Sequence, residues 1–239
     1  MSTGDADTPQ GLGPTALDWE AVTPKHWYAT RGHQLVDAVL LTVVSIPALC
    51  LMTLIALCNL ITFGDCQKIF FKQLRPGLRG KQFELYKFRT MHDAPEGNFC
   101  AWRGGDKARV TAFGRLLRST HLDELPQIIN ILQGEMSFIG PRPEMLEIES
   151  WAGDNIPGFE ARLAIKPGIT GLAQISQGYT GCDVPAYTEK LNICLDYMRR
   201  MSPWLDIQII FGTVIWMLKG KGWHWKAQEQ TNAAISVAK

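Results

Sequence analysis

The sequence predicts an α+β fold that is mostly helical and is anchored to a membrane near its N-terminus. Three observations support this prediction. No charged side chain occurs between Ala38 and Phe63, and roughly 20 consecutive apolar residues suffice to span a bilayer as a helix. The segment Phe70–Met91 alternates apolar and polar residues over short stretches, as strands do. Beyond it, much of the chain places apolar residues at helical spacing.

Length and composition exclude several classes of protein. The chain has 239 residues and a formal net charge of +1, so one domain with appendages is expected. The balanced charge and the lack of a nucleic-acid motif predict no nucleic-acid partner. None of the six cysteines forms a Cys-x-x-Cys pair, which argues against zinc and against a disulfide framework. We therefore expect reduced thiols and a main domain that faces the cytosol.

Composition divides the chain into four segments. Residues 1–30 are rich in Gly, Pro, Thr and Asp, and they predict a flexible N-terminal leader. Residues 31–66 form the expected membrane helix, and residues 67–219 the compact domain. Residues 220–239 form a polar C-terminal tail.

The membrane segment is predicted to enter and leave on the same side of the bilayer. Pro47 removes a backbone hydrogen bond and should bend the helix. Basic residues flank the segment on both sides, among them Lys25 and Arg31 before it and Lys68 and Lys72 after it. Because Lys and Arg favour the cytosolic side, both ends prefer that side. We expect a re-entrant helix; the alternative is an ordinary kinked span, since Pro is tolerated in membrane helices.

The compact domain is expected to combine short strands with several helices. The strands fall within Phe70–Met91, around a turn at Arg75-Pro76-Gly77. Loops are expected at Asp93–Lys107 and Ile165–Leu172, and a stiff turn at Pro141-Arg142-Pro143. Helical periodicity occurs at Ala112–Leu117, Leu122–Leu132, Glu144–Ala152, Tyr187–Met201 and Leu205–Leu218. The last of these is too short to span a bilayer comfortably and is expected to lie in the interface as an amphipathic helix.

The most informative stretch holds the adjacent carboxylates Asp123 and Glu124, at the expected start of the helix Leu122–Leu132. The first turn of a helix carries unpaired N–H groups and a dipole that favour negative charge. A carboxylate kept ionised beside arginines can act as a nucleophile, metal ligand or base in phosphate chemistry. The simpler alternative is that both residues only cap the helix, since Asp and Glu are common in first turns.

Five motifs in a fixed order carry a resemblance to a known family. They are Gln73-Leu74-Arg75-Pro76-Gly77, Lys87-Phe88-Arg89-Thr90-Met91, Leu122-Asp123-Glu124-Leu125-Pro126-Gln127 with Asn130, Gly134-Glu135-Met136-Ser137-Phe138-Ile139-Gly140-Pro141-Arg142-Pro143, and Lys166-Pro167-Gly168-Ile169-Thr170-Gly171. From about Gln34 to Lys219, the chain resembles the bacterial sugar transferase family, the monotopic phosphoglycosyl transferases. Any one motif is weak evidence, but all of them in order behind one apolar segment are specific.

The resemblance implies a reaction, a location and site residues. Such enzymes move a sugar 1-phosphate from a nucleotide diphosphate sugar, here expected to be a UDP-sugar, to a polyprenyl phosphate such as undecaprenyl phosphate. By analogy, Asp123 attacks the sugar-linked phosphorus and holds the phosphosugar covalently, and a nucleoside monophosphate is released. Glu124 would help to hold Mg²⁺, with Mn²⁺ as the alternative. The implied place is the cytosolic face of the bacterial inner (cytoplasmic) membrane, where the reaction starts assembly of a surface polysaccharide or glycoconjugate.

Cations are needed because two anionic substrates must meet at one carboxylate. The candidates for binding the substrate phosphates are Lys87, Arg89, Arg118 and Arg142. Arg suits bidentate phosphate binding, whereas Lys acts as a point charge. For Lys87 and Arg89 the alternative is the solvated face of a strand, whereas the stiff Pro-Arg-Pro turn favours a functional role for Arg142. We expect Arg75-Pro76-Gly77 to be only a turn, and Asp93 only a solvated loop residue.

The chain departs from the family pattern at a few positions. His121 stands where a Ser usually precedes Leu-Asp-Glu, and Thr120 with Asp123 is a possible substitute for that cap. Lys166 occupies a position where Arg is common. Cys194 occupies a position where an acidic residue is expected, and this change indicates a different donor sugar or altered activity.

Two other classes of function compete with this interpretation. A non-enzymatic membrane adaptor is one, and the intact Asp123–Glu124 pair argues against it. The other is a membrane-anchored glycosyltransferase. That enzyme would release a nucleoside diphosphate, so the identity of the released nucleotide separates the two enzyme classes.

Overall fold

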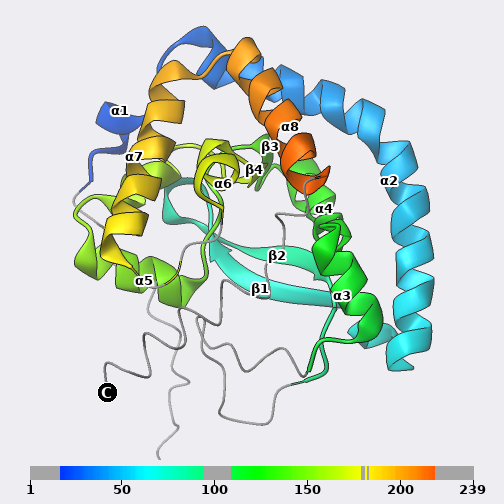
Figure 1. Ribbon diagram of the computed structural model, residues 1–239. Helices are drawn as coiled ribbons and strands as arrows, with labels where there is room; N and C mark the ends of the chain where they lie inside the picture. Colours follow the sequence, from blue (N-terminus) through cyan, green and yellow to red (C-terminus); the bar gives the residue numbers. More distant parts are fainter. Residues whose placement is uncertain (1–16, 94–108, 179–180, 182, 219–239) are drawn as a thin grey trace, which may run out of the picture.

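The structure is a computed structural model, and it describes residues 17–93, 109–178, 181 and 183–218. Helices predominate around two small sheets (Figure 1), which confirms the mostly helical α+β class. The helices are α1 (Trp19–Val22), α2 (His33–Phe63), α3 (Ala112–Ser119), α4 (Gln127–Leu132), α5 (Leu146–Asn155), α6 (Leu172–Gln177), α7 (Val184–Arg200) and α8 (Pro203–Leu218). Shorter turns are the π-helical η1 (Tyr28–Gly32) and the 3₁₀ helices η2 (Cys66–Lys68), η3 (Leu78–Gly80), η5 (Leu122–Glu124) and η6 (Phe159–Ala164).

The strands β1 (Phe70–Pro76) and β2 (Gln82–Phe88) form an antiparallel hairpin, as the alternation predicted. The connection lies later than expected, because Arg75 and Pro76 still pair as the end of β1. The chain reverses instead through η3, where the amide of Gly77 donates to the carbonyl of Lys81 at 2.9 Å. Arg79 and Gly80 adopt the positive φ angles that this longer turn requires.

The second sheet was not predicted from the sequence. The strands β3 (Ser137–Ile139) and β4 (Gly168–Thr170) pair in parallel, whereas residues 165–172 were expected to form a loop. Strands of three residues are too short to show an alternating pattern. The pairing depends on glycine, because a Cβ on Gly140 would lie only 2.5 Å from the carbonyl oxygen of Lys166.

The helix α2 contains the uncharged segment and continues through Pro47 without a break. Figure 1 shows that α2 changes direction, its first part crossing the top of the view and its second part running down one side. A proline inside a helix is a common cause of such a bend. By length and composition, Tyr28–Phe63 qualifies as a membrane-crossing helix. The helix ends at Gly64, which adopts a left-handed conformation with φ of 66°.

Polar side chains near both ends of α2 bind the compact domain. Asp37 accepts a hydrogen bond of 3.0 Å from the amide of Phe138. Asn59 is 1% exposed and donates to the carbonyls of Ile69 and Arg89, each at 3.0 Å. The two ends of the membrane segment therefore contact the same domain.

The segment before α2 is more ordered than a flexible leader. Asp18 caps α1 through hydrogen bonds from two backbone amides, and Trp19 packs against the core formed with α7 and α8. Tyr28 is buried and donates a hydrogen bond to Asp206 of α8. The expected leader is thus wrong for residues 18–30, because these aromatic side chains find a core to enter. Residues 1–16 and the tail after Leu218 lie outside the described residues.

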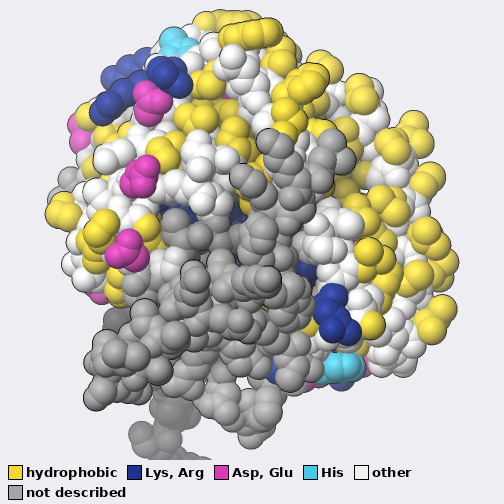
Figure 2. All heavy atoms as spheres, in the orientation of Figure 1, with side chains coloured by type: hydrophobic (Ala, Val, Ile, Leu, Met, Phe, Trp, Pro, Cys, Tyr) yellow, Lys and Arg dark blue, Asp and Glu magenta, His cyan; other side chains and the backbone are white. Residues whose placement is uncertain are grey.

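The C-terminal helices agree with the predictions, with shifted boundaries. α7 begins earlier than expected because the Asp183 side chain caps it and Pro185 occupies its first turn. α5 begins after Glu144, whose carboxylate pairs with Lys190 instead of entering the helix. Figure 2 shows hydrophobic side chains gathered over α2 and α8. On α8 the exposed large apolar side chains are Trp204, Ile207, Phe211, Val214, Ile215 and Met217.

Candidate active site

Asp123 and Glu124 lie in a separate 3₁₀ turn between α3 and α4, not in the first turn of one long helix. The expected helix over residues 122–132 is divided because Pro126 precedes the first turn of α4. The expected cap at Thr120 is also wrong, since its hydroxyl donates to the carbonyl of Leu116 at 2.8 Å. His121 instead turns the chain with a φ of 57°.

Close packing fixes this turn against the β1–β2 hairpin. The Asn130 side chain is fully buried and accepts from the amide of Tyr86 at 3.1 Å. It also donates to the carbonyl of Glu84 at 2.7 Å. The Asn130 side chain thus satisfies backbone groups of β2 that a neighbouring strand would otherwise pair. These bonds hold α4 beside the strand that carries Lys87.

Glu124 is held by two cations from different parts of the chain. It accepts a hydrogen bond of 2.7 Å from Lys87 on β2. Arg142 donates to both of its oxygens, at 2.6 and 3.2 Å, which is the bidentate arrangement that guanidinium favours. Burial alone would raise the pKa of Glu124, but the charges of Arg142 and Lys87 outweigh it and hold that pKa well below its usual value. Glu124 is therefore ionised throughout the physiological range.

Asp123 has the opposite environment, although it is the adjacent residue. Its side chain is buried, with 9% exposed, and no hydrogen-bond donor within the described ranges contacts it. Burial raises the pKa of Asp123 to about 6, and the negative charge of Glu124 adds to that effect against the opposing charge of Lys87. Near neutral pH, Asp123 is then an ionised carboxylate, which is the form that a nucleophile requires. Two neighbouring carboxyls with separated pKa values are a frequent property of catalytic sites.

The Pro141-Arg142-Pro143 turn is held from behind by two buried arginines. Arg75 donates to the carbonyl of Pro143 at 3.1 Å, and Arg162 donates to the carbonyl of Arg142 at 2.8 Å. Residues 75–77 were expected to form only a turn, and no motif in the sequence singled out Arg162. Arg75 is 7% exposed, and burial together with the charge of Arg142 lowers its pKa to about 10. The sequence of β1 carries no signal for this burial, because the apolar Leu74 is exposed and the charged Arg75 beside it is buried.

Arg162 belongs to a buried network of charges that extends behind the turn. Its guanidinium pairs with Glu149, while Lys190 donates to Glu144 at 2.5 Å. Burial would raise the pKa of Glu144, but the charges of Lys190 and Arg162 lower it to about 2. Cys194 is buried beside this network, and burial raises the pKa of its thiol to about 11. At the position where an acidic residue was expected, the chain therefore places a neutral thiol.

Arg118 lies in the last turn of α3. Its Nε donates to the hydroxyl of Thr90 at 2.8 Å and its Nη2 to the sulfur of Met91 at 2.7 Å. Its positive charge acts to lower the pKa of Asp123, so Arg118 lies within electrostatic reach of that carboxylate. Lys87, Arg118 and Arg142 are thus brought to the Asp123–Glu124 turn.

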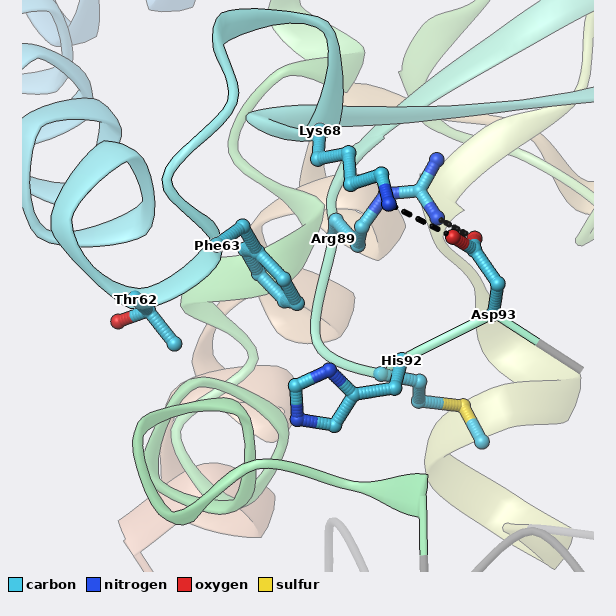
Figure 3. Close-up of a pocket in the computed structure, with 7 residues that line it drawn as sticks. Thr62, Phe63, Lys68, Arg89, His92 and Asp93 are labelled. Atoms are coloured by element: carbon cyan, nitrogen blue, oxygen red, sulfur yellow. Dashed lines mark hydrogen bonds and ion pairs between the residues drawn. The ribbon is translucent and has the colours of Figure 1, made fainter.

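Arg89 is directed elsewhere, into a small pocket of about 90 Å³ at the end of α2 (Figure 3). There Asp93 accepts a hydrogen bond of 2.6 Å from Arg89 and lies 3.0 Å from the ammonium of Lys68. The side chain of Phe63 at the end of α2 stacks edge-on against His92 in the same pocket. Asp93 is therefore an ion-paired residue, whereas it was expected to be only solvated. The predicted loop from residue 94 to 107 lies outside the described residues.

His121 connects the site to the last turns of α8. Its ring centroid lies 5.2 Å from that of Trp216. Burial lowers the pKa of His121, so it is neutral at physiological pH. His121, which stands where the family usually has Ser, thus makes an aromatic contact with Trp216 two residues before Asp123.

The adjacent carboxylates Asp123 and Glu124, which we call the dyad, fit a hard divalent cation that arrives with a phosphate ligand. In the described part of the chain, no group of three or more His, Cys, Asp or Glu side chains could hold a metal ion by itself. Mg²⁺ commonly needs only one or two protein carboxylates when substrate phosphates supply the other oxygens. Asp123 and Glu124 are two adjacent carboxylates, and the oxygens of Glu124 also accept hydrogen bonds from Lys87 and Arg142.

Comparison with known proteins identifies the family. The family model described as bacterial sugar transferase matches residues 28–220. A UDP-glucose:undecaprenyl-phosphate glucose-1-phosphate transferase from Caulobacter vibrioides is 36% identical over 77% of this chain and 67% of its own length. An Escherichia coli protein of the same name is also 36% identical over 77% of this chain, but over only 39% of its own length.

An Aeromonas hydrophila UDP-N-acetylgalactosamine-undecaprenyl-phosphate N-acetylgalactosaminephosphotransferase is 34% identical over 84% of this chain and 46% of its own length. The chain thus spans less than half the length of the latter two relatives. The family match covers the apolar helix, the dyad and the turn around Arg142 together. The chain therefore belongs to the bacterial sugar transferase family of enzymes.

Proposed function

We propose that this enzyme transfers a sugar 1-phosphate from a UDP-sugar to undecaprenyl phosphate through a covalent intermediate on Asp123, with release of UMP. The observation that carries the proposal is the contrast within the dyad. Glu124 is held by Lys87 and Arg142, while Asp123 is a buried carboxylate with a raised pKa. The names of the relatives, which specify UDP-sugars and undecaprenyl phosphate, support the choice of substrates.

The first step forms a bond between an Asp123 oxygen and the sugar-linked phosphorus. The bond between that phosphorus and the bridging oxygen of the diphosphate breaks, and the electron pair leaves with UMP. In the second step an oxygen of undecaprenyl phosphate attacks the same phosphorus and displaces the Asp123 carboxylate. No proton has to move in either step, so a separate base is not required. Dividing one difficult transfer into two displacements is the usual benefit of a covalent intermediate.

The cations around the dyad would bind the phosphates in both steps. The guanidinium of Arg142 lies on a turn braced by Arg75 and Arg162 and is paired with Glu124 in this structure. Arg118 and Lys87 lie within electrostatic reach of Asp123. Arg89 is paired with Asp93, so it would contact a substrate phosphate at the edge of the site and not at its centre.

We further propose that Mg²⁺, with Mn²⁺ as the alternative, enters with the donor and is held by Glu124, whose oxygens it would share with Lys87 and Arg142. When bound, it would cancel part of the charge of the diphosphate. Removal of divalent ions with EDTA should stop UMP release, and added Mg²⁺ should restore it. Undiminished turnover in EDTA would show that the cations of the protein suffice.

The proposed topology is a re-entrant α2, with the compact domain on the cytosolic face of the bacterial inner membrane. Hydrogen bonds from the same domain reach Asp37 near one end of α2 and Asn59 near the other. A helix that crossed the bilayer would separate these contacts by the thickness of the membrane. The basic residues on both flanks agree with this placement. In that location the reaction would initiate the synthesis of a surface polysaccharide or glycoconjugate.

Incubation of membranes that contain the enzyme with a panel of UDP-sugars and undecaprenyl phosphate tests the function. The expected products are UMP and a lipid diphosphate sugar that retains one phosphate of the donor. Release of UDP instead would identify a glycosyltransferase. Absence of any nucleotide product with every donor would favour a binding protein.

A further inference from the structure

Apolar side chains of α2 and α8 form the walls of a groove with a volume of about 200 Å³. Leu40 and Val44 line it from α2, and Ile210 and Val214 line it from α8. Its floor is the β3–β4 sheet with the adjoining side of α8, through Phe138, Ile169, Thr170 and Thr213. The polar atoms of the floor are already used, because the hydroxyls of Thr170 and Thr213 bond each other at 2.6 Å. The groove therefore suits hydrocarbon and offers no site for a charged group.

The groove lies between elements that carry most of the exposed apolar surface. Close to its walls, Val43 of α2 is 67% exposed and Phe211 of α8 is 68% exposed. Figure 2 shows the same concentration of hydrophobic side chains over α2 and α8. Contiguous exposed apolar surface of this kind marks a contact with lipid or with an apolar ligand.

The groove also leads toward the dyad. Thr213 of its floor precedes Trp216 by about one helical turn on α8. The ring of Trp216 contacts His121, two residues before Asp123. A ligand that lay along the groove would thus have one end in the apolar surface and the other near the nucleophile.

We propose that this α2–α8 groove binds the hydrocarbon chain of the polyprenyl phosphate acceptor and so directs the phosphate of the acceptor to Asp123. This inference rests on the proposed function and names the place where one of its two substrates binds. A cavity of about 150 Å³ holds a benzene-sized molecule, so the volume of about 200 Å³ accommodates at least one branched five-carbon unit. The remainder of the chain would leave the groove and enter the surrounding lipid.

Matched tryptophan substitutions test the proposal on the full-length enzyme in lipid nanodiscs. Val44→Trp and Ile210→Trp fill the groove from its two walls. Val43→Trp and Phe211→Trp are the controls, since each places the same indole ring at the neighbouring residue, on the exposed side of the same helix. None of these residues contacts the dyad in any described interaction.

Two measurements separate the half-reactions. Exchange of labelled UMP into UDP-sugar, without acceptor, reports formation of the covalent intermediate. The apparent KM for undecaprenyl phosphate reports binding of the acceptor. The groove variants should raise that KM on the order of tenfold, the loss expected when about two buried methylene equivalents are displaced. They should leave the exchange rate within about twofold, and the controls should change neither quantity.

The inference is overturned if the groove variants leave the acceptor KM unchanged, which would assign the groove to ordinary membrane lipid. A rise in the controls equal to that in the groove variants overturns it as well. If the tryptophan variants lose the exchange reaction because they misfold, Val44→Ala and Ile210→Ala replace them, and the same rise in KM is expected. A wild-type enzyme without UMP exchange and without transfer would instead refute the proposed function, and this inference with it.

Discussion

Asp123 and Glu124 are adjacent in the chain, yet their surroundings give them different tasks. Glu124 has its oxygens occupied by Lys87 and Arg142, so it fixes the positions of those two cations. Asp123 is buried, and its pKa is raised to about 6. The pair therefore combines one carboxylate in a network of ion pairs with one that is buried and has a raised pKa.

Substitution of each carboxylate by its amide should have opposite effects on stability. Asp123→Asn should abolish UMP release and the covalent adduct without lowering the melting temperature. The raised pKa of Asp123 means that its ionised form costs stability above about pH 6. Glu124→Gln should destabilise the fold by about 3 kcal/mol, because Lys87 and Arg142 would lose their buried counter-ion. Thermal melts at pH 8, together with mass spectrometry of the adduct, check both; an active Asp123→Asn variant would refute the nucleophile.

The same pKa shift predicts how activity depends on pH. The nucleophile must be ionised, so kcat/KM should fall as the pH drops below about 6. Glu124 has a lowered pKa, so its contribution to stability is present above its ordinary value of 4.5 and is lost only as the pH falls further. A pH profile of UMP release should accordingly decline before the protein unfolds. Activity that remained constant down to pH 4.5 would contradict the assignment.

Arg142 should be intolerant of replacement by another cation. Arg142→Lys keeps the charge but loses the fork that binds both oxygens of Glu124. We expect kcat/KM to fall on the order of a hundredfold, which corresponds to about 2.7 kcal/mol of transition-state binding. The melting temperature should change little, because Lys87 still neutralises Glu124. Near-normal kinetics would mean that the Pro-Arg-Pro turn has only a structural role.

At the scale of secondary-structure elements, side-chain hydrogen bonds to backbone groups join several helices and turns to the rest of the domain. Asn130 fastens α4 to β2, and Arg162 fastens the Arg142 turn to the buried network behind it. Asn59 does the same for α2, since its amide reaches two carbonyls at the ends of the hairpin. Each of these contacts fixes the position of one element relative to the β1–β2 hairpin or to the Arg142 turn.

Replacement of Asn59 tests the contact between α2 and the hairpin. Asn59→Leu has a similar volume but leaves the carbonyls of Ile69 and Arg89 without their donor. We expect a loss of about 1–3 kcal/mol of stability, the usual result of an unsatisfied buried acceptor. Urea unfolding in detergent measures it. The matched control is Leu57→Ala at an exposed position of the same helix, which should cost less than about 0.5 kcal/mol.

At the scale of the whole molecule, α2 is both the long apolar helix, which we propose as the membrane anchor, and a part of the compact domain. Its inner side packs Ile55 against Phe88 and Leu117, while Val43 and Ile46 are among its exposed residues. The bend in α2 and the contacts at both of its ends let one helix serve both purposes (Figure 1).

The proposed topology predicts that both termini of the chain face the cytosol. After replacement of the native cysteines, single cysteines at positions Ser2 and Gln228 should both resist a membrane-impermeant reagent applied to intact cells. Pro47→Leu should straighten α2 and favour a true span, which moves the N-terminus outside. Labelling of the Ser2 site alone in the otherwise wild-type protein would establish a spanning helix instead.

The sequence alone determined the fold class, the family and the apolar helix, because these depend on local periodicity and on motifs contiguous in the chain. The β1–β2 hairpin was predictable for the same reason. The motifs also identified Asp123, Glu124 and Arg142 as candidate site residues without any knowledge of their geometry.

Only the tertiary structure decided how these residues divide their roles. Burial and charge at Asp123 depend on Lys87 and Arg142, which come from distant segments. No local pattern predicts that Arg162 braces the catalytic turn, because its partners lie elsewhere in the chain. The β3–β4 pair and the α2–α8 groove likewise exist only after separate segments meet. Periodicity records which side of an element is apolar, whereas long-range packing determines what that side touches.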